Sequence, residues 1–193
     1  MMKIGITGGI GSGKSIIGKI LSIKGFPVFY SDLEAKRIML HDKKVVAEIK
    51  QIFGDEAYLD NDINRSFLAD KIFNQPELKN KVNAIVHPAV RQAFEDFAKN
   101  HQNTLVFNEA AILFETGGYK NFDSTILVIA DEDLRLKRVM DRDNASMKSV
   151  KERMKNQWSD KKKADLADFI IENNENSLLV PQVEKIISKL QSN

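Results

Sequence analysis

A glycine-rich segment near the amino terminus has the residue types and spacing of a phosphate-binding loop. Residues 8–15 read Gly-Gly-Ile-Gly-Ser-Gly-Lys-Ser, which fits the pattern G-x-x-x-x-G-K-[ST] in full. Glycines allow successive backbone N–H groups to turn towards phosphate oxygens at close range. Lys14 would reach the β- and γ-phosphates of a nucleoside triphosphate, and the Ser15 hydroxyl would coordinate Mg²⁺. The candidate nucleotide-binding residues are Gly11, Ser12, Gly13, Lys14, Ser15 and Ile16.

The setting of this loop decides between phosphate binding and a glycine-rich turn that binds nothing. The apolar run Ile4-Gly5-Ile6 precedes the loop, and apolar residues at helical spacing follow it. A strand, a loop and a helix in this order place the helix amino terminus, with its free N–H groups and positive dipole end, at the phosphates. We therefore expect this chain to bind a nucleoside triphosphate.

Two carboxylates follow predicted strands and are candidates for chemistry beside the loop. Asp32 comes after the apolar run at 26–30 and could accept the proton of an alcohol that receives a phosphoryl group. Its alternative role is a helix N-cap only. Glu109 closes the run 105–109 and resembles a carboxylate that holds Mg²⁺ directly or through water. Its alternative is a strand-end carboxylate paired with a surface lysine.

Three arginines share one face of a predicted helix. Arg135, Arg138 and Arg142 stand at i, i+3 and i+7, a spacing that aligns side chains on a helix. Such a face can stabilise the charge of a migrating phosphoryl group, and we expect Arg138 and Arg142 to act in this way from a mobile lid. The alternative is a solvated basic face paired with neighbouring aspartates. The lysine run 161–163 is expected to be solvated as well.

The elements that must position these residues alternate between strands and helices. Apolar runs predict strands at 3–7, 26–30, 104–107, 125–129 and 169–171. Helical patterns follow the loop to about 24, begin after Asp32, run from a cap at Asp131 to about 142, and cover about 178–190. This alternation predicts an α/β fold of the P-loop NTPase type, with a five-stranded parallel sheet between helical layers.

About 70 residues between the second and third predicted strands contain no convincing strand, which is far longer than an ordinary connection. Helices are expected at 43–53, 65–74 and 77–100, the last broken near His87-Pro88. The interpretation is one domain with a core at about 1–33, 101–130 and 166–193. A helical acceptor-binding insertion would occupy about 34–100, and a lid about 131–165.

Composition narrows the class of protein further. The chain has 193 residues, a net charge of +2 and no cysteine, which excludes disulfides, thiolate zinc sites and cysteine nucleophiles. The near-neutral charge does not call for nucleic acid or an anionic membrane as partner. No apolar run approaches the roughly 20 residues of a membrane span, and no signal peptide is evident at the amino terminus. We expect a cytoplasmic protein, either a monomer or a weak homo-oligomer.

Four segments together resemble the dephospho-CoA kinase family along the whole chain. They are the loop at 7–15, Asn64-Arg65-Ser66-Phe67-Leu68 with Ile85-Val86-His87-Pro88, residues 112–117, and residues 153–157 with 167–173. The resemblance implies an ATP- and Mg²⁺-dependent kinase that phosphorylates the ribose 3′-hydroxyl of dephospho-CoA, the last step of coenzyme A synthesis. It implies a base at Asp32, lid arginines at Arg138 and Arg142, and Asn173 beside the adenine. It places Arg65, His87, Arg91 and Glu115 on the acceptor side.

Two other functions remain open from the sequence. One is a different small-molecule kinase of the same fold, such as a nucleoside monophosphate kinase. The other is a nucleotide-dependent switch or binding protein. A GTPase switch would carry an Asn-Lys-x-Asp motif after a later strand, and the nearest string, Asn80-Lys81-Val82-Asn83, lacks the aspartate.

Overall fold

The structure, a computed structural model, describes residues 1–60, 62–102 and 104–192. The chain forms two compact units. Unit 1 combines residues 1–29 with residues 101–193, and unit 2 comprises residues 30–100. The division means that unit 2 interrupts unit 1 in the sequence, between the second and third strands of the main sheet.

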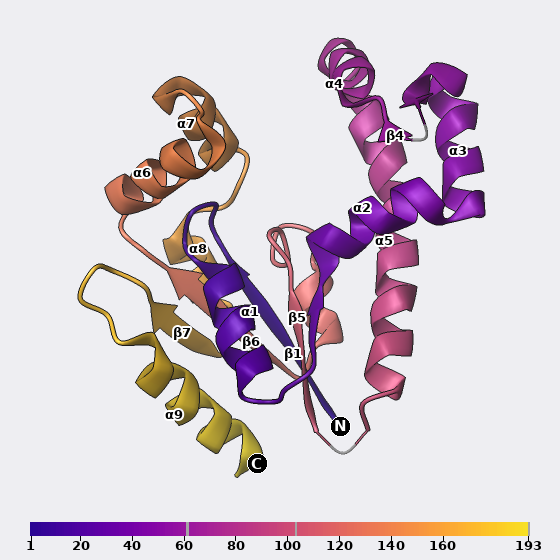
Figure 1. Cartoon of the computed structure of the whole chain (residues 1–193). Coiled ribbons are helices and arrows are strands. Elements are labelled where there is room, and N and C mark those ends of the chain that lie inside the picture. Colours follow the sequence, from indigo (N-terminus) through magenta and orange to yellow (C-terminus); the bar gives the residue numbers. More distant parts are fainter. Residues whose placement is uncertain (61, 103, 193) are drawn as a thin grey trace. The chain divides into compact units, whose positions relative to one another are not determined.

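A five-stranded parallel sheet organises unit 1, as the sequence predicted (Figure 1). Its strands are β1 (Met2–Gly8), β2 (Val28–Tyr30), β5 (Leu105–Glu109), β6 (Ser124–Ile129) and β7 (Phe169–Glu172), in the order β2-β5-β1-β6-β7. The central strand β1 has parallel neighbours on both sides, with Ile6 opposite Glu109 of β5 and Ile126 of β6. Because the strands are parallel, their carboxyl ends meet at one edge, where the glycine-rich loop begins.

Two helices complete the core of unit 1. Helix α1 (Lys14–Ile23) and helix α9 (Leu179–Gln191) pack against each other. Ile17 and Leu21 of α1 and Val183 of α9 lie in the same buried cluster as Ile4 and Ile6 of β1. At roughly 25 cal/mol for each Å² of apolar surface removed from water, this burial is the main source of the unit's stability.

Three further helices lie between β6 and β7. They are α6 (Glu132–Asp143), α7 (Met147–Lys155) and α8 (Asp160–Ala164). Helices α6 and α7 pack together through a small cluster that contains Leu136, Val139 and Val150. Asn144 joins them with a left-handed backbone, φ +48°, a conformation that asparagine tolerates better than most residues.

Unit 2 is mainly helical. It contains α2 (Ser31–His41), α3 (Lys43–Phe53), α4 (Arg65–Asn74) and α5 (Glu77–Lys99). A turn of 3₁₀ helix, η1 (Asp55–Ala57), leads to a short antiparallel pair, β3 (Tyr58–Leu59) and β4 (Asp62–Ile63). The expectation of no strand in this region was therefore wrong. Two residues for each strand are too few to give a readable period-two pattern.

Helix α5 is unbroken, although a break near His87-Pro88 was expected. A proline inside a helix leaves the carbonyl four residues earlier without its usual partner. That residue is Ala84, which is exposed, so water can hydrate its carbonyl. Val86 and Phe94, on either side of the proline, are buried. Their packing outweighs the local preference against proline.

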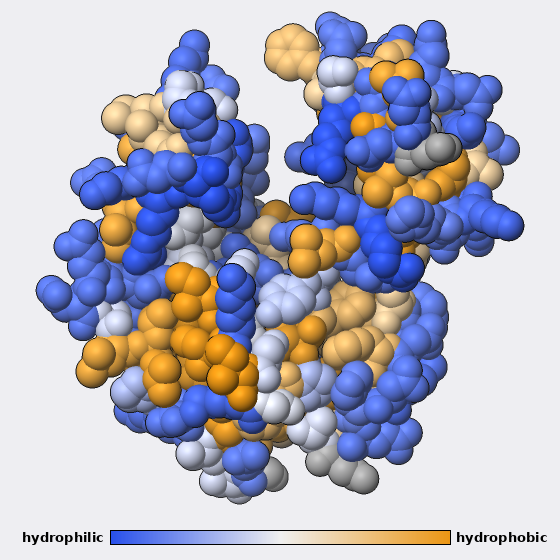
Figure 2. All heavy atoms as spheres, viewed as in Figure 1, coloured by the Kyte–Doolittle hydropathy of each residue, from blue (hydrophilic) through white to orange (hydrophobic). Residues whose placement is uncertain are grey.

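Figure 2 shows an apolar region over α1 and the start of α9. Exposed apolar side chains in these elements and just before α9 include Ile16, Ile23, Leu178 and Val180. No helix among the described residues is both long enough and apolar enough to span a membrane.

Candidate active site

The glycine-rich loop connects β1 to α1 and has the backbone of a phosphate-binding loop. Gly11 and Gly13 have positive φ angles of +80° and +94°, which glycine adopts without the steric cost that other residues meet. The Ser12 N–H donates to the Gly9 carbonyl at 3.0 Å and closes the turn. Helix α1 then begins at Lys14, so its amino-terminal N–H groups lie at the end of the loop.

Neighbouring segments pack so closely on this loop that side chains at several positions would not fit. A Cβ at Gly8 would lie 2.3 Å from the Val128 carbonyl oxygen. A Cβ at Gly13 would lie 2.0 Å from Nδ2 of Asn173, which donates to the Ser12 carbonyl at 2.8 Å. The structure therefore brings Asn173, a candidate adenine-side residue, directly onto the loop.

The candidate metal ligands belong to the same sheet edge. Glu109 is the last residue of β5 and lies opposite Ile6, just before the loop. It is 6% exposed, and Lys14 is 9% exposed. The Ser15 hydroxyl and the Glu109 carboxylate offer the hard oxygen donors that Mg²⁺ prefers, so the residues present fit that ion. Among the described residues no three His, Asp or Glu side chains gather as a metal cluster.

The arginines of α6 have different surroundings. Nε of Arg142 lies 2.7 Å from Asp143, which also pairs with Arg153 at 2.8 Å. These partners lower the pKa of Asp143 to about 2. Nη1 of Arg138 is buried and has no hydrogen-bond partner among the described residues. A buried guanidinium nitrogen without a partner is costly, so this group fits a ligand anion.

Arg135, which was not expected to be a working residue, contacts the loop directly. Its Nε donates to the Ile10 carbonyl at 3.0 Å, and its Nη1 lies 2.8 Å from Asp160. Gln157 accepts from the Ile10 N–H at 2.8 Å. The sequence placed Arg135 on the arginine face and Gln157 in the segment 153–157, but it gave no sign that either contacts the loop, because both lie more than 100 residues from it along the chain.

Glu115 has a protein partner on the same side of the sheet. Its Oε1 lies 2.8 Å from Nζ of Lys163 and accepts from the Trp158 N–H at 3.1 Å. Lys163 is fully buried, so the expectation that the lysine run is solvated was wrong for its third member. Lys161 and Lys162 are exposed, and Lys162 lies 3.5 Å from the centre of the Trp158 ring.

Unit 2 carries the remaining predicted residues. Asp32 is exposed and lies in the first turn of α2, which begins at Ser31 with Tyr30 as its N-cap. The expected helix start after Asp32, and the alternative role of Asp32 as its N-cap, are therefore wrong. Arg65 is the first residue of α4. His87 and Arg91 lie one turn apart on α5. Burial lowers the pKa of His87, and the positive charge of Arg91 lowers it further.

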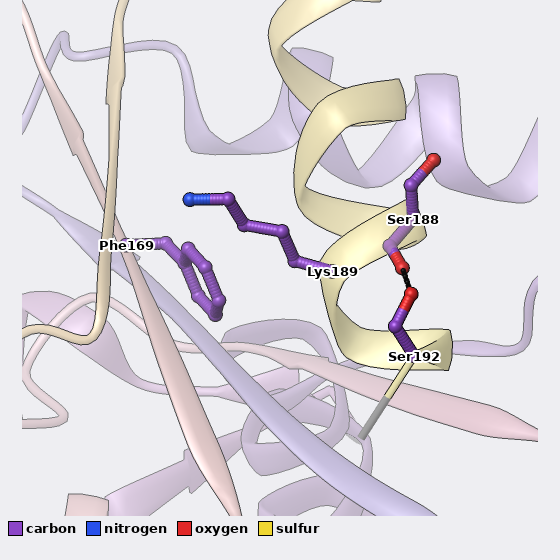
Figure 3. A pocket seen from close by; sticks show the side chains of 4 residues that line it. All are labelled: Phe169, Ser188, Lys189 and Ser192. Atoms are coloured by element: carbon purple, nitrogen blue, oxygen red, sulfur yellow. Dashed lines mark hydrogen bonds between the residues drawn. The ribbon is translucent and has the colours of Figure 1, made fainter.

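Two cavities of unit 1 differ in their relation to this site. One of about 350 Å³ lies between β7 and α9, lined by Phe169, Ser188, Lys189 and Ser192 (Figure 3). Figure 3 shows Lys189 extending beside the Phe169 ring. Phe169 begins β7, so this cavity belongs to the edge opposite the loop. The other, of about 430 Å³, is lined by Arg135, Gln157, Trp158 and Asp160 among others, beside the groups that hold Ile10.

The sheet order, the complete phosphate-binding loop and the arginine-bearing helix after β6 define a P-loop kinase. Comparison with known families specifies it further: the dephospho-CoA kinase family matches residues 2–178. The chain belongs to the dephospho-CoA kinase family.

The chain also matches curated relatives over most of their length. The chain is 36% identical to dephospho-CoA kinase of Bacteroides fragilis over 191 residues, which are 98% of this chain and 93% of that protein. It is 42% identical to dephospho-CoA kinase of Salinibacter ruber over 177 residues, 90% of this chain and 89% of that protein.

Solved structures show the same fold. Dephospho-CoA kinase from Campylobacter jejuni superposes with a TM-score of 0.71 at 28% identity, covering 98% of this chain and 97% of that one. The protein TT1252 of Thermus thermophilus gives a TM-score of 0.83 at 30% identity, covering 99% and 96% of the two chains. A shikimate kinase from Acinetobacter baumannii, at 15% identity and a TM-score of 0.56, shares the fold.

Proposed function

We propose that this chain transfers the γ-phosphate of ATP to the ribose 3′-hydroxyl of dephospho-CoA, the final step of coenzyme A biosynthesis. The observation that carries the proposal is the family match over residues 2–178. It covers the complete phosphate-binding loop and the helical insertion together. The same match disfavours a nucleoside monophosphate kinase and a nucleotide switch.

The reaction is an in-line displacement at phosphorus. The acceptor oxygen forms a bond to the γ-phosphorus while the bond from that phosphorus to the β–γ bridging oxygen breaks, and ADP leaves. In this proposal Asp32 orients the ribose hydroxyl and accepts its proton. Asp32 is exposed in the first turn of its helix, so its carboxylate is accessible to a substrate hydroxyl.

The groups that hold the transferred phosphate come from unit 1. The loop backbone from Gly11 to Ser15 would bind the phosphates, and Lys14, Arg138 and Arg142 would stabilise the charge on the γ-phosphoryl group. The buried Nη1 of Arg138 supports this role for that arginine. Asn173 would lie beside the adenine, and its Nδ2 donates to the Ser12 carbonyl of the loop.

Mg²⁺ is the second component in this proposal. Ser15 and Glu109 would hold the ion, which when bound neutralises charge on the β- and γ-phosphate oxygens. The acceptor side would be formed by Arg65, His87 and Arg91. Glu115 would shape it indirectly, because its Oε1 contacts Lys163 and the Trp158 backbone.

The proposal is tested by measuring ADP release with ATP and Mg²⁺, with and without dephospho-CoA, while mass spectrometry follows the product. ADP release that depends on dephospho-CoA and yields coenzyme A is the expected result. ADP release that does not depend on dephospho-CoA would be consistent with the nucleotide site but would refute dephospho-CoA as the acceptor. A panel of nucleoside monophosphates and other alcohols would then identify the alternative kinase activity.

Three further properties belong to this proposal. We infer a cytoplasmic enzyme that acts as a monomer or weak homo-oligomer and has no nucleic-acid partner. The small net charge of +2 supports the absence of a nucleic-acid partner. Light scattering across a concentration series tests the oligomeric state.

A further inference from the structure

Both backbone polar groups of Ile10, at the tip of the phosphate-binding loop, are held by side chains from outside the loop. The Ile10 N–H donates to Oε1 of Gln157 at 2.8 Å. The Ile10 carbonyl accepts from Nε of Arg135 at 3.0 Å. The peptide groups on either side of this residue are therefore fixed in orientation, and the rotation that would turn neighbouring N–H groups away from a phosphate is opposed.

Each of these two side chains is itself fixed by a second contact. Nε2 of Gln157 donates to the Ala111 carbonyl at 3.3 Å. Nη1 of Arg135 lies 2.8 Å from Oδ2 of Asp160, and the Arg135 side chain is only 11% exposed. A partly buried, charge-assisted contact of this kind is stronger than one in water. The hydrogen bonds to Ile10 thus come from oriented groups rather than from side chains that rotate freely.

The segment that carries Gln157 and Asp160 has its own anchor. Glu115 binds it at two points, through the Trp158 N–H and through Nζ of the fully buried Lys163. Residues 157–163 are therefore fastened to the connection after β5, and they hold the loop tip from that position.

The loop glycines fit this arrangement. A Cβ at Gly9 would lie 2.1 Å from Nη2 of Arg135, and one at Gly11 would lie 2.5 Å from the Arg135 carbonyl oxygen. At Gly11 the close atom is backbone of α6, so only glycine fits there, and at Gly9 a side chain would have to displace the Arg135 guanidinium from its contacts. Two glycines of the motif thus serve the contact with Arg135 in addition to any contact with phosphate.

We propose that Gln157 and Arg135 are positioning residues for the phosphoryl transfer, which hold the phosphate-binding loop in its nucleotide-binding conformation before the nucleotide arrives. The inference rests on the proposed kinase function. A loop that is already ordered loses less conformational freedom on binding. Loss of either residue should therefore weaken nucleotide binding, although in this proposal neither residue contacts the reacting atoms.

The test is the affinity for Mg²⁺–ADP, measured by calorimetry, because it involves no acceptor and no chemistry. Gln157→Ala should raise the dissociation constant about three- to tenfold, the effect of losing one or two net hydrogen bonds. Amide hydrogen exchange at Ile10 should become faster. The KM for ATP should rise by the same factor while kcat changes by less than about twofold.

Asp168→Ala is the matched control in the same unit. Asp168 also accepts hydrogen bonds across a long sequence separation, from the N–H and the hydroxyl of Thr125 at 2.8 Å each. It immediately precedes β7, at the sheet edge opposite the loop. The Asp168→Ala substitution should lower the midpoint of thermal unfolding and leave the Mg²⁺–ADP affinity unchanged.

A second variant tests the idea without touching the loop. Asp160→Asn keeps the size of the side chain and removes the charge that pairs with Arg135, and it should raise the dissociation constant a few-fold. The proposal is overturned if Gln157→Ala and Asp160→Asn lower thermal stability but bind Mg²⁺–ADP like the unmodified protein. It is also overturned if Asp168→Ala weakens binding equally. If dephospho-CoA is not the acceptor, the Mg²⁺–ADP affinities of these variants are unaffected. The positioning role and the proposed reaction can therefore be refuted independently.

Discussion

Asp32 is the side chain on which the proposed proton transfer depends, and a single substitution isolates it. Asp32→Asn keeps the size and removes the charge that accepts the proton. We expect kcat to fall by about 10²- to 10⁴-fold, the usual contribution of a general base, with little change in either KM. Steady-state kinetics with both substrates measures this.

Glu34→Gln is the control for Asp32→Asn. Glu34 lies in the same first turn of α2 and pairs with Arg37. The Glu34→Gln substitution should leave kcat unchanged, because the partner of Glu34 is an exposed arginine on the same helix. A rise in KM without a fall in kcat for Asp32→Asn would contradict a role in the chemical step.

The buried pair of Glu115 and Lys163 makes a prediction about stability. Removing one partner of such a pair leaves an uncompensated buried charge, which costs about 3–5 kcal/mol. Glu115→Gln should therefore lower the free energy of unfolding by about that amount, as measured in urea. Lys163→Met in the same chain should recover much of the loss.

Lys162→Met serves as the exposed comparison, and it should change the free energy of unfolding by less than about 1 kcal/mol. Equal costs for Glu115→Gln and Lys162→Met would show that the buried pair adds nothing beyond a surface contact. The difference between neighbouring lysines also marks a limit of sequence analysis. Burial of Lys163 depends on Glu115, 48 residues earlier, and a run of three lysines gives no sign of it.

At the scale of elements, two glycines allow the cost of a left-handed backbone to be measured separately from the cost of a packing clash. Gly11 and Gly25 have nearly equal positive φ angles, +80° and +86°. An alanine at either position costs roughly 1–2 kcal/mol for its left-handed backbone. Only Gly11 also meets a neighbour, the Arg135 carbonyl oxygen.

Gly11→Ala should therefore cost about 1–3 kcal/mol more than Gly25→Ala in the free energy of unfolding. It should also weaken Mg²⁺–ADP binding, while Gly25→Ala should not. Urea unfolding and calorimetry of both variants measure this. Similar values for the two variants would mean that α6 moves away from the loop at little cost.

Helix α5 predicts a dependence of stability on pH through His87. Burial and Arg91 lower the pKa of this residue in the folded protein below its unfolded value of about 6.5. The unfolded state then binds the proton more readily, so stability falls as the pH drops below about 6.5 towards the folded pKa. The thermal midpoint between pH 7 and 5 should fall less in His87→Gln than in the unmodified protein. Equal slopes would contradict the assignment.

The helices show which elements can be predicted from sequence. Bounds of 43–53 and 65–74 are confirmed, because Asp42 and Asn64 accept N–H hydrogen bonds at the helix starts and such caps are local signals. The continuity of α5 through Pro88 was not predictable in the same way. It depends on packing of the whole helix in unit 2, which outweighs the preference of one residue.

At the scale of the whole molecule, the two compact units predict a divided response to nucleotide. Mg²⁺–ADP at about 100 times its dissociation constant stabilises the state that binds it by about 2.7 kcal/mol. Amide exchange should slow in the loop and in α1 and α6 of unit 1. The amides of α3 and α5 in unit 2, with a separate buried cluster, should exchange as before. Uniform slowing in both units would show that they open together.

The burial of Lys163 also makes it a chemical reporter. An amine-reactive acylating reagent modifies the accessible side-chain amines of Lys161 and Lys162, whereas Lys163 is fully enclosed and paired with Glu115. Acylation of Lys163 would therefore wait for α8 to open. Because the three lysines fall in one peptide, mass spectrometry can time the modification of the third against the first two. That ratio gives the rate at which this segment opens in the intact protein, without any substitution.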